Sequence, residues 1–165
     1  MGKVSSKYLK VDPNLLIEEG FHQDKNMVSE SLFSLGNEYS GVRGFFEEGI
    51  SLPSLIGTYY NGIIEYALED IPNAYKGIAK RTHFTINSTN YLKCLIQIDG
   101  ETLDLAKVKF KDFKRVLDMN SGLLTRTFTL LTNKGEVELS FKRILGMKSH
   151  HFAIQEISFK ANYDV

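Results

Sequence analysis

Four glycines within fourteen residues constrain the fold of this chain more than any other feature of its sequence. They are Gly36, Gly41, Gly44 and Gly49, and short apolar pieces separate them. Because glycine adopts positive φ without steric cost, this spacing predicts a backbone that turns repeatedly. The polar side chains interleaved with them are able to contact a sugar or a neighbouring domain, and they are Asn37, Tyr39, Arg43, Glu47 and Glu48. These five are the candidate site residues.

The composition is that of a soluble globular protein. A length of 165 residues suits a single domain, and the hydrophobic content of 42% is ordinary. Basic and acidic residues number 20 each, so the formal net charge is zero, which argues against a nucleic-acid partner. No apolar run is long enough to cross a bilayer, and no signal-peptide core follows the first residues. We therefore expect a cytoplasmic protein with no membrane partner.

The last two-thirds of the chain is predicted to be β-structure. Residues 91–98 are rich in strand formers, and Asp99-Gly100 after them is a strong hairpin signal. Residues 113–117 form a further extended piece. Leu124, Arg126, Phe128 and Leu130 then alternate with threonines, and Val137, Leu139 and Phe141 alternate with polar residues. Short strands separated by turn signals predict an antiparallel β-sandwich.

The last strand changes phase along its length. Phe152 and Ile154 share one face, whereas Ile157 and Phe159 share the other. A β-bulge near Gln155 or Glu156 would explain the change, and so would a strand that is covered on both faces.

The first third is less regular. Residues 15–17 and 32–35 are candidate strands, and the glycines within residues 54–68 argue against a long helix there. The predicted fold is therefore all-β, with an irregular N-terminal third, and residues 1–165 form one domain.

No catalytic or metal-binding constellation is evident. Cys94 lies in an apolar run and is expected to be a buried, unreactive thiol. The four histidines do not have the spacing of a zinc site. Adjacent carboxylates on a strand point to opposite faces, so neither Glu18-Glu19 nor Glu47-Glu48 is expected to form a glycosidase pair. We expect both pairs to be solvated or interface charges.

Arg43 is the most informative single charge in the glycine-rich run. Its guanidinium group could clamp a ligand carboxylate with two hydrogen bonds. The alternative is a structural salt bridge with Glu30, Glu47 or Glu48. Asn37 is expected to serve the turn itself, because asparagine tolerates left-handed backbone.

Several motifs in order resemble one known family. Beyond the run from Glu30 to Gly49, they are Pro53, Gly57-Thr58-Tyr59, Leu68-Glu69-Asp70-Ile71-Pro72-Asn73, Ile98-Asp99-Gly100-Glu101, Arg115-Val116-Leu117-Asp118-Met119 and Gly122-Leu123-Leu124-Thr125-Arg126. Together they resemble the N-terminal domain of glycoside hydrolase family 65, the disaccharide phosphorylases and their hydrolase relatives. Glu38 and Ser40 depart from the family pattern, and Glu38 argues against a positive φ at that position.

The resemblance implies a β-supersandwich of the galactose-mutarotase-like type. It also implies that the chemistry lies in an (α/α)6 barrel on polypeptide that follows, so no residue of this chain is expected to be catalytic. Members of the family act on maltose-, trehalose- or kojibiose-type sugars, most with inorganic phosphate as co-substrate. The implied partners are the catalytic barrel, a disaccharide and a second copy in a homodimer; no other cofactor is implied.

Three functions follow from these observations. The first is a non-catalytic domain that packs on the barrel, with Asn37, Tyr39, Arg43, Glu47 and Glu48 facing the barrel or the substrate rim. The second is a stand-alone carbohydrate-binding module whose aromatic platform is Tyr59, Tyr60, Tyr66 and Tyr75. The third is a sugar epimerase, which would need a histidine and a carboxylate within hydrogen-bond reach.

Overall fold

The computed structural model describes residues 7–68 and 81–164. Its strands are β1 (Leu9–Val11), β2 (Leu15–Glu19), β3 (Leu35–Gly36), β4 (Ser40–Val42), β5 (Thr58–Tyr60), β6 (Ile64–Leu68), β7 (Arg81–Thr85), β8 (Gln97–Ile98), β9 (Glu101–Thr102), β10 (Phe110–Asp118), β11 (Leu123–Leu131), β12 (Glu136–Leu145) and β13 (Ala153–Ala161). A 3-10 turn, η1 (Gln23–Lys25), leads into one helix, α1 (Asn26–Leu32). Strands dominate and every pair is antiparallel, which confirms the predicted all-β sandwich.

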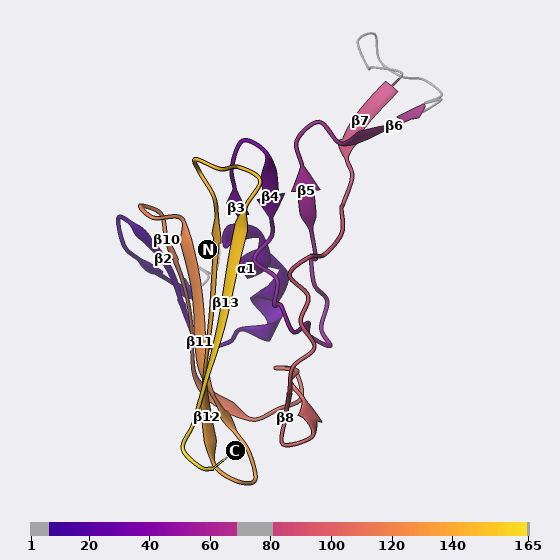
Figure 1. The fold of residues 1–165 in the computed structure, drawn as a ribbon. Coiled ribbons are helices and arrows are strands. Elements are labelled where there is room, and N and C mark those ends of the chain that lie inside the picture. Colours follow the sequence, from indigo (N-terminus) through magenta and orange to yellow (C-terminus); the bar gives the residue numbers. More distant parts are fainter. Residues whose placement is uncertain (1–6, 69–80, 165) are drawn as a thin grey trace, which may run out of the picture.

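One long sheet forms the first layer. Its six strands follow the order β1-β2-β10-β11-β12-β13, and β10 to β13 form a meander of consecutive hairpins (Figure 1). The alternation in residues 124–130 and 137–141 predicts this geometry, because one face of each strand is buried. Turns with glycine at positive φ connect the hairpins, as at Gly122 with φ 68°.

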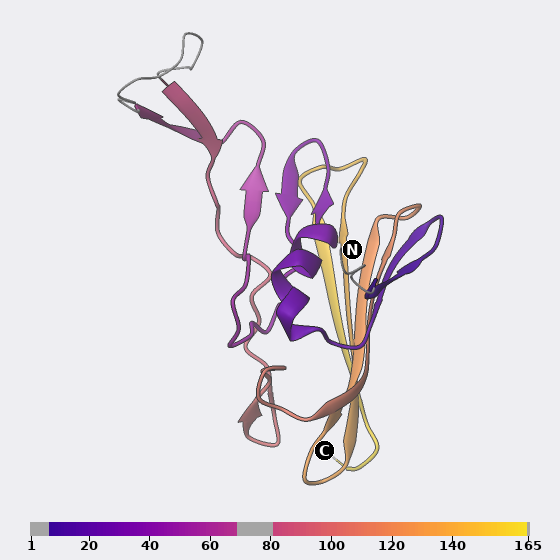
Figure 2. The ribbon, with the colours of Figure 1, turned by 180° about the vertical axis from the view of Figure 1, so that it is seen from behind.

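The second layer is irregular, as predicted for the first third of the chain. Helix α1 and the small sheet β3-β4-β5 lie against one face of the long sheet, together with residues 86–109, which are irregular apart from the short β8–β9 hairpin (Figures 1 and 2). The hairpin of β6 and β7 projects away from the two layers in both views. The resemblance motif at Leu68–Asn73 and the tyrosine at position 75 lie almost wholly outside the described residues.

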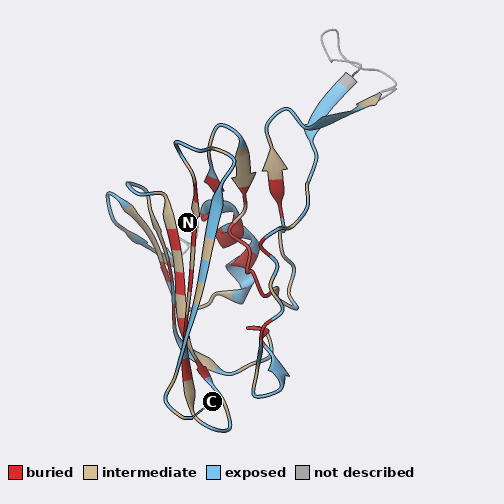
Figure 3. Cartoon of the chain, viewed as in Figure 1, coloured by how far each residue is buried: buried red, intermediate tan, exposed pale blue. Residues whose placement is uncertain are grey.

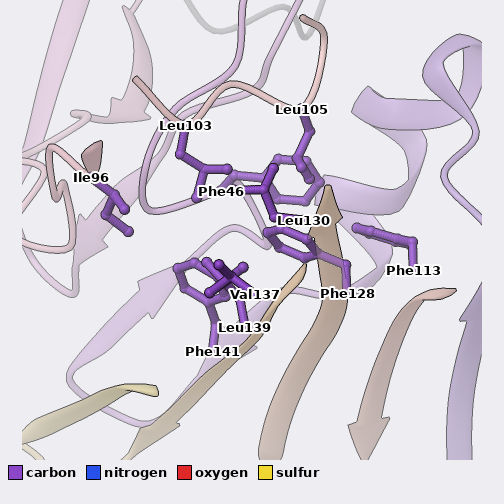
Figure 4. Packing of buried hydrophobic residues seen from close by; sticks show 10 residues of the cluster. All are labelled: Phe46, Ile96, Leu103, Leu105, Phe113, Phe128, Leu130, Val137, Leu139 and Phe141. Carbon is purple, nitrogen blue, oxygen red and sulfur yellow. The ribbon is translucent and has the colours of Figure 1, made fainter. Parts of the chain in front are cut away.

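The core between the layers consists of two clusters. The larger contains aromatic and aliphatic side chains from both layers (Figure 4): Phe46, Ile96, Leu103, Leu105, Phe113, Phe128, Leu130, Val137, Leu139 and Phe141. The smaller gathers beside α1 and contains Phe33, Leu35, Val42, Phe45, Leu92, Leu124 and Leu145. Buried residues follow the inner face of the long sheet and the coil opposite it (Figure 3).

Three local predictions are wrong. Residues 32–35 do not form a strand, because Leu32 ends α1 and only Leu35 enters β3. Residues 91–98 are mostly coil, and only the last two form β8, although the Asp99-Gly100 hairpin is confirmed with φ of 52° and 81°. Residues 91–96 are partly buried but pair with no strand, so their apolar side chains indicate packing against the core rather than a β-strand.

The third wrong prediction concerns the phase change of the last strand. The pairing of β13 with β12 runs without interruption from Ala153 to Ala161, so there is no bulge there. Both faces are not covered either, since Ile154 and Phe159 are 64% and 51% exposed. The bulge of this sheet lies instead in β10, where the register shifts around Asp112, a residue with φ of 56°.

Candidate functional site: the glycine-rich segment

The glycine-rich segment divides into two parts with different surroundings. Residues 37–40, here called the hairpin tip, connect β3 to β4 at the surface. Residues 43–49, here called the arginine-bound segment, cross the inner face of the long sheet. Gly44 through Glu48 are buried. Gly49 ends this segment with φ of 81°, as its spacing predicts.

Three buried arginines on the long sheet hold the second part. Arg115 on β10 lies opposite Arg126 on β11 and, on its other side, opposite Glu18 of β2. Arg143 lies on β12 opposite Leu124. All three side chains are at most 4% exposed. They lie between the two apolar clusters, because Phe128 and Leu124 flank Arg126 on the same strand face.

The arginines bind main-chain oxygens as well as carboxylates. Arg143 donates to the carbonyls of Arg43 and Phe45, each at 2.9 Å, and Arg115 donates to the carbonyl of Gly44 at 3.0 Å. Three successive carbonyls are thus satisfied by guanidinium groups. Because a guanidinium group presents five donors in a planar fork, it can serve several acceptors at once.

The carboxylates of Glu47 and Glu48 complete the arrangement. Arg126 donates to Glu48 at 2.6 and 2.5 Å and to Glu47 at 2.9 Å, while Arg143 donates to Glu47 at 2.6 Å. The guanidinium group of Arg126 also lies 4.1 and 4.0 Å from the ring centroids of Phe46 and Phe141. Both carboxylates are therefore buried and paired, and the expectation of solvated or interface charges is wrong for them.

Glu47 and Glu48 converge because they lie in a turn, not in a strand. The Gly49 N–H donates to the Phe46 carbonyl at 3.1 Å, so the backbone reverses there and both side chains reach Arg126. The opposite-face rule for strands does not apply to turn residues.

The pKa values in this cluster follow from burial opposed by opposite charge. Burial alone would raise the pKa of Glu47, but the charges of Arg126 and Arg143 outweigh it and hold that pKa below its usual value. Burial would likewise lower the pKa of Arg126, but Glu48 and Glu47 raise it. For Arg115 burial dominates and lowers the pKa to about 10 despite Glu18 nearby. Glu47, Arg115 and Arg126 are therefore charged at neutral pH.

Close contact with the end of α1 explains why residue 44 is a glycine. The Gly44 N–H donates to the Glu30 carbonyl at 2.7 Å, and a Cβ at this position would lie 2.8 Å from the Phe33 carbonyl oxygen and Cβ. Real Cβ atoms do not approach backbone so closely, so only glycine allows the arginine-bound segment to pass the end of the helix.

Arg43 is not paired with any of the three glutamates proposed for it. Its side chain donates to the Ser31 hydroxyl at 2.9 Å and to the Tyr59 hydroxyl at 3.4 Å. Glu30 instead accepts hydrogen bonds from Asn26 and Ser54, at 3.0 and 2.7 Å, and from the Leu55 N–H. The intradomain salt-bridge interpretation of Arg43 is therefore wrong, and its half-buried side chain lies beside α1.

Asn37 serves its turn and also joins two hairpins. Its carbonyl oxygen accepts hydrogen bonds from the Tyr39 and Ser40 N–H groups, at 2.9 and 2.7 Å, so Asn37 serves the turn as predicted. Its φ is not positive, however, so the left-handed backbone expected for it is wrong. Its amide donates to the carbonyls of Gly146 and His150, at 2.8 and 3.1 Å, in the β12–β13 connection. The two connections lie side by side in Figures 1 and 2. Glu38 does not have a positive φ, in agreement with the prediction.

An open cavity of about 250 Å³ lies beside the hairpin tip. Its walls come from the tip, from β5, from the coil before β8 and from the end of the β12–β13 connection. The lining residues are Tyr39, Ser40, Tyr60, Tyr91, His150, His151, Phe152 and Ala153.

The aromatic platform proposed for a carbohydrate module is dispersed. Tyr60 packs on Tyr39, with ring centroids 5.4 Å apart, whereas Tyr66 pairs with His83 on the projecting β6–β7 hairpin. Tyr59 lies against Gly57, near Arg43. These tyrosines do not share one surface.

The residues considered from sequence for metal binding, epimerase chemistry and thiol reactivity lie in separate parts of the described structure. Among residues 7–68 and 81–164, no three histidine, cysteine, aspartate or glutamate side chains are grouped as metal ligands would be. His22 approaches Glu18 at 3.6 Å, but Glu18 is fully buried against Arg115, so this pair offers no open epimerase site. Cys94 is half-buried beside the larger core cluster. Within the same residues, no helix has the length and apolar character to span a membrane.

Sequence reasoning missed the three arginines. Arg126 occupies an apolar position of a period-two pattern, and Arg143 continues the pattern of Val137, Leu139 and Phe141. An arginine on the buried face of a strand requires a buried acceptor. That signal points to a partner, but it does not identify residues 78 positions away, as Glu48 is from Arg126.

Comparisons with known proteins decide the family. The family model of the glycosyl hydrolase family 65 N-terminal domain matches residues 16–165. The chain belongs to this family. The expectation of an N-terminal domain of glycoside hydrolase family 65 is thereby confirmed.

Individual relatives agree with this assignment. The chain is 35% identical over 153 residues to an alpha,alpha-trehalose phosphorylase and 29% identical over 154 residues to a kojibiose phosphorylase, both from Thermoanaerobacter brockii. It covers 20% and 18% of those proteins, which in turn match 86% and 92% of this chain. A solved structure titled a putative kojibiose phosphorylase from human microbiome superposes with a TM-score of 0.85 at 57% identity, over 94% of this chain and 21% of that one. The chain therefore spans about a fifth of the length of the relatives it matches.

Proposed function

We propose that this chain is the N-terminal domain of a longer cytoplasmic enzyme that cleaves an α-linked glucosyl disaccharide. The chain itself carries no catalytic residue. Inorganic phosphate is the co-substrate of the enzyme, and the catalytic barrel is the partner on which this domain packs. The single observation that supports the proposal best is the family match combined with coverage of only about a fifth of each phosphorylase relative.

An exposed apolar edge supports a large protein partner. Strand β13 is the edge of the long sheet, so one side of its backbone has no neighbouring strand among the described residues. Ile154 and Phe159 on this strand are 64% and 51% exposed, and Leu95 in the facing coil is 77% exposed. A groove of about 470 Å³ lies between Leu95 and Phe159. Apolar surface of this kind favours burial against another protein surface.

The glycine-rich segment contributes two of its five candidate residues to this role. Tyr39 and Arg43 remain accessible and face the barrel or the rim of its substrate pocket. Asn37, Glu47 and Glu48 act indirectly, because their side chains fix the backbone that presents Tyr39 and Arg43. A homodimer of the whole enzyme is part of the proposal, with this domain at or near the interface.

Activity of the chain alone tests the first part. The purified chain is incubated with maltose, trehalose or kojibiose, with and without inorganic phosphate, and glucose and glucose 1-phosphate are measured. We expect no turnover above buffer. Turnover that co-purifies with the chain would overturn the proposal.

Complementation tests the packing. A kojibiose phosphorylase relative is truncated to remove the residues that match this chain, and this chain is added in trans. We expect partial recovery of phosphorolysis, and a loss of that recovery when Ile154→Asp and Phe159→Asp are combined. Phe84→Asp is the matched control, because Phe84 is 46% exposed but lies on the projecting β7. Equal recovery with all variants would contradict a docking role for β13.

The stand-alone carbohydrate module remains a second candidate because of the aromatic cavity beside the hairpin tip. It differs from the first in requiring no partner. Failure of complementation together with sugar binding by the isolated chain would favour it.

A further inference from the structure

The cavity beside the hairpin tip has a rigid aromatic wall. Tyr39 packs against Tyr60 at 5.4 Å and against His151 at 4.2 Å between ring centroids, with the histidine edge-on. Tyr91 and Phe152, which are 41% and 68% exposed, line the same cavity. Aromatic rings in solvent-accessible positions are unfavourable for a monomer unless another group covers them.

Four parts of the chain that are distant in sequence build this wall, and hydrogen bonds join three of them. The amide of Asn37 joins the hairpin tip to the β12–β13 connection through the carbonyls of Gly146 and His150. Strand β5 pairs with β4 next to the tip, which places Tyr60 opposite Ser40. The rings are therefore positioned before any ligand arrives, which reduces the entropy lost on binding.

The lining is polar but uncharged apart from its two histidines. Neither lysine nor arginine is among the described residues around the cavity. Burial raises the pKa of Tyr91, and Tyr60 nearby adds to the effect, so the phenol is protonated at neutral pH and can donate a hydrogen bond. Such a lining does not suit phosphate, which requires cationic or multiple N–H donors.

These features together match one ligand chemistry. A pyranose ring has an apolar face of C–H groups, which packs on aromatic faces, and a rim of hydroxyls, which exchange hydrogen bonds with phenol, hydroxyl and imidazole groups. A cavity of about 250 Å³ that is open to solvent is small for a drug-sized ligand and suits one sugar ring with the next ring outside.

We propose that the cavity formed by Tyr39, Tyr60, Tyr91, His151 and Phe152 is a binding site for one neutral glucosyl unit of an oligosaccharide. The choice of α-linked glucosyl sugars among pyranoses rests on the proposed function above; the site itself rests on the geometry of the cavity. Its role is to hold sugar near the enzyme rather than to transform it.

Titration of the full 165-residue chain tests the site. Maltose, trehalose and kojibiose are titrated by ligand-observed NMR, with cellobiose and inorganic phosphate as comparisons. We expect saturable binding of at least one α-linked sugar with Kd of about 1–10 mM and no binding of phosphate. Phe152→Ala and Tyr39→Ala should each weaken binding by about tenfold or more, because each removes a ring from the wall.

Phe84→Ala is the matched control, since it removes a partly exposed phenylalanine away from the cavity and should leave Kd unchanged. Phe152 is 68% exposed, so its removal should not impair folding, which circular dichroism checks. The site would be overturned if none of the sugars bound saturably when present at up to about 50-fold excess over the protein. Equal binding by the wild type, Phe152→Ala and Tyr39→Ala would overturn it as well.

The outcomes separate this site from the proposed function. Binding of cellobiose alone, lost in Phe152→Ala, would support the cavity but contradict the α-glucoside assignment. Absence of sugar binding, with complementation in trans impaired by Phe152→Ala, would overturn the sugar site, keep the domain assignment and identify the cavity as a protein contact.

Discussion

The arginine-bound segment and the hairpin tip belong to one glycine-rich run, yet they are held in different ways. Residues 43–49 are fixed by charged groups in a space closed to water, where Arg126 and Arg143 satisfy carbonyls and carboxylates. Residues 37–40 are fixed by the neutral amide of Asn37 at the edge of solvent. Residues 44–48 of the first part are buried and offer no surface to a ligand, whereas the second part lies at the surface. One glycine-rich run therefore contains both a buried segment that is held by the arginines and a hairpin tip that is exposed at the surface.

The largest expected effect is on stability, from loss of the buried charges that hold the arginine-bound segment. Arg126→Ala leaves Glu47 and Glu48 buried without their main partner, so we expect a loss of about 3–5 kcal/mol in the free energy of unfolding. Denaturant unfolding measures it. Arg43→Ala is the control, because its half-buried side chain contacts only two hydroxyls, and we expect a loss below about 1 kcal/mol. Equal losses would contradict the claim that the buried ion pairs of Arg126 stabilise the fold more than the half-buried Arg43 side chain does.

A second substitution tests the close passage beside α1. Gly44→Ala places a Cβ 2.8 Å from the Phe33 carbonyl oxygen. The backbone at the end of α1 cannot move easily to relieve this contact. We expect a loss of about 2–3 kcal/mol from overpacking, measured by thermal or denaturant unfolding. Gly41→Ala is matched to it, because the nearest atom there is 3.8 Å from the added Cβ. If Gly41→Ala were the more damaging of the two, the steric explanation would be wrong.

Acid should weaken the attachment of Ser51, just beyond the arginine-bound segment, to Asp104. Burial would raise the pKa of Asp104, but hydrogen bonds from Ser51 and Ala106 lower it to about 2. A folded-state pKa below the unfolded value means that the stabilisation is present above about pH 4 and is lost as the pH falls towards 2. We expect a contribution of about 2 kcal/mol to this loss, measured by urea unfolding at several pH values. Asp104→Asn should flatten the curve; an unchanged slope would contradict the assignment.

The smallest effect is expected at the hairpin tip. Asn37→Ala removes hydrogen bonds that are partly open to water, so we expect a loss of about 1 kcal/mol in stability. Sugar binding should weaken more than stability does, since the cavity depends on the position of Tyr39. Asn37→Asp retains the acceptor and removes the amide donors. A sugar affinity that Asn37→Asp leaves intact would show that the link to the β12–β13 connection does not position the cavity.

The long sheet could be predicted from sequence because its signal is local. Alternation over residues 124–130 and 137–141 reports directly which face is buried. The family resemblance added the family assignment, which the family match confirms. The helix α1 was missed because its N-cap residue, Lys25, makes no side-chain cap hydrogen bond, so the usual signal for a helix start is absent.

The candidate site could be predicted only in part, because its contacts are not local. The glycine spacing predicted repeated turns, and of the four glycines only Gly49 has a positive φ. Gly44 is needed for the close approach to Phe33, and Gly36 and Gly41 lie in strands. It could not indicate that Glu47 and Glu48 point inward, because their partners on β11 and β12 lie about eighty to a hundred positions later. The apolar run at residues 91–98 likewise indicates burial but not a ladder, because the Cys94 N–H bonds to the coil at Glu47.

Recognition of carbonyl oxygens by Arg115 and Arg143 has one evolutionary consequence. A main-chain oxygen is the same whatever side chain its residue carries, so position 43 is anchored without reference to the identity of its residue. Mutations there can accumulate at little thermodynamic expense, and the outward chemistry of the domain can diversify while its internal frame is preserved.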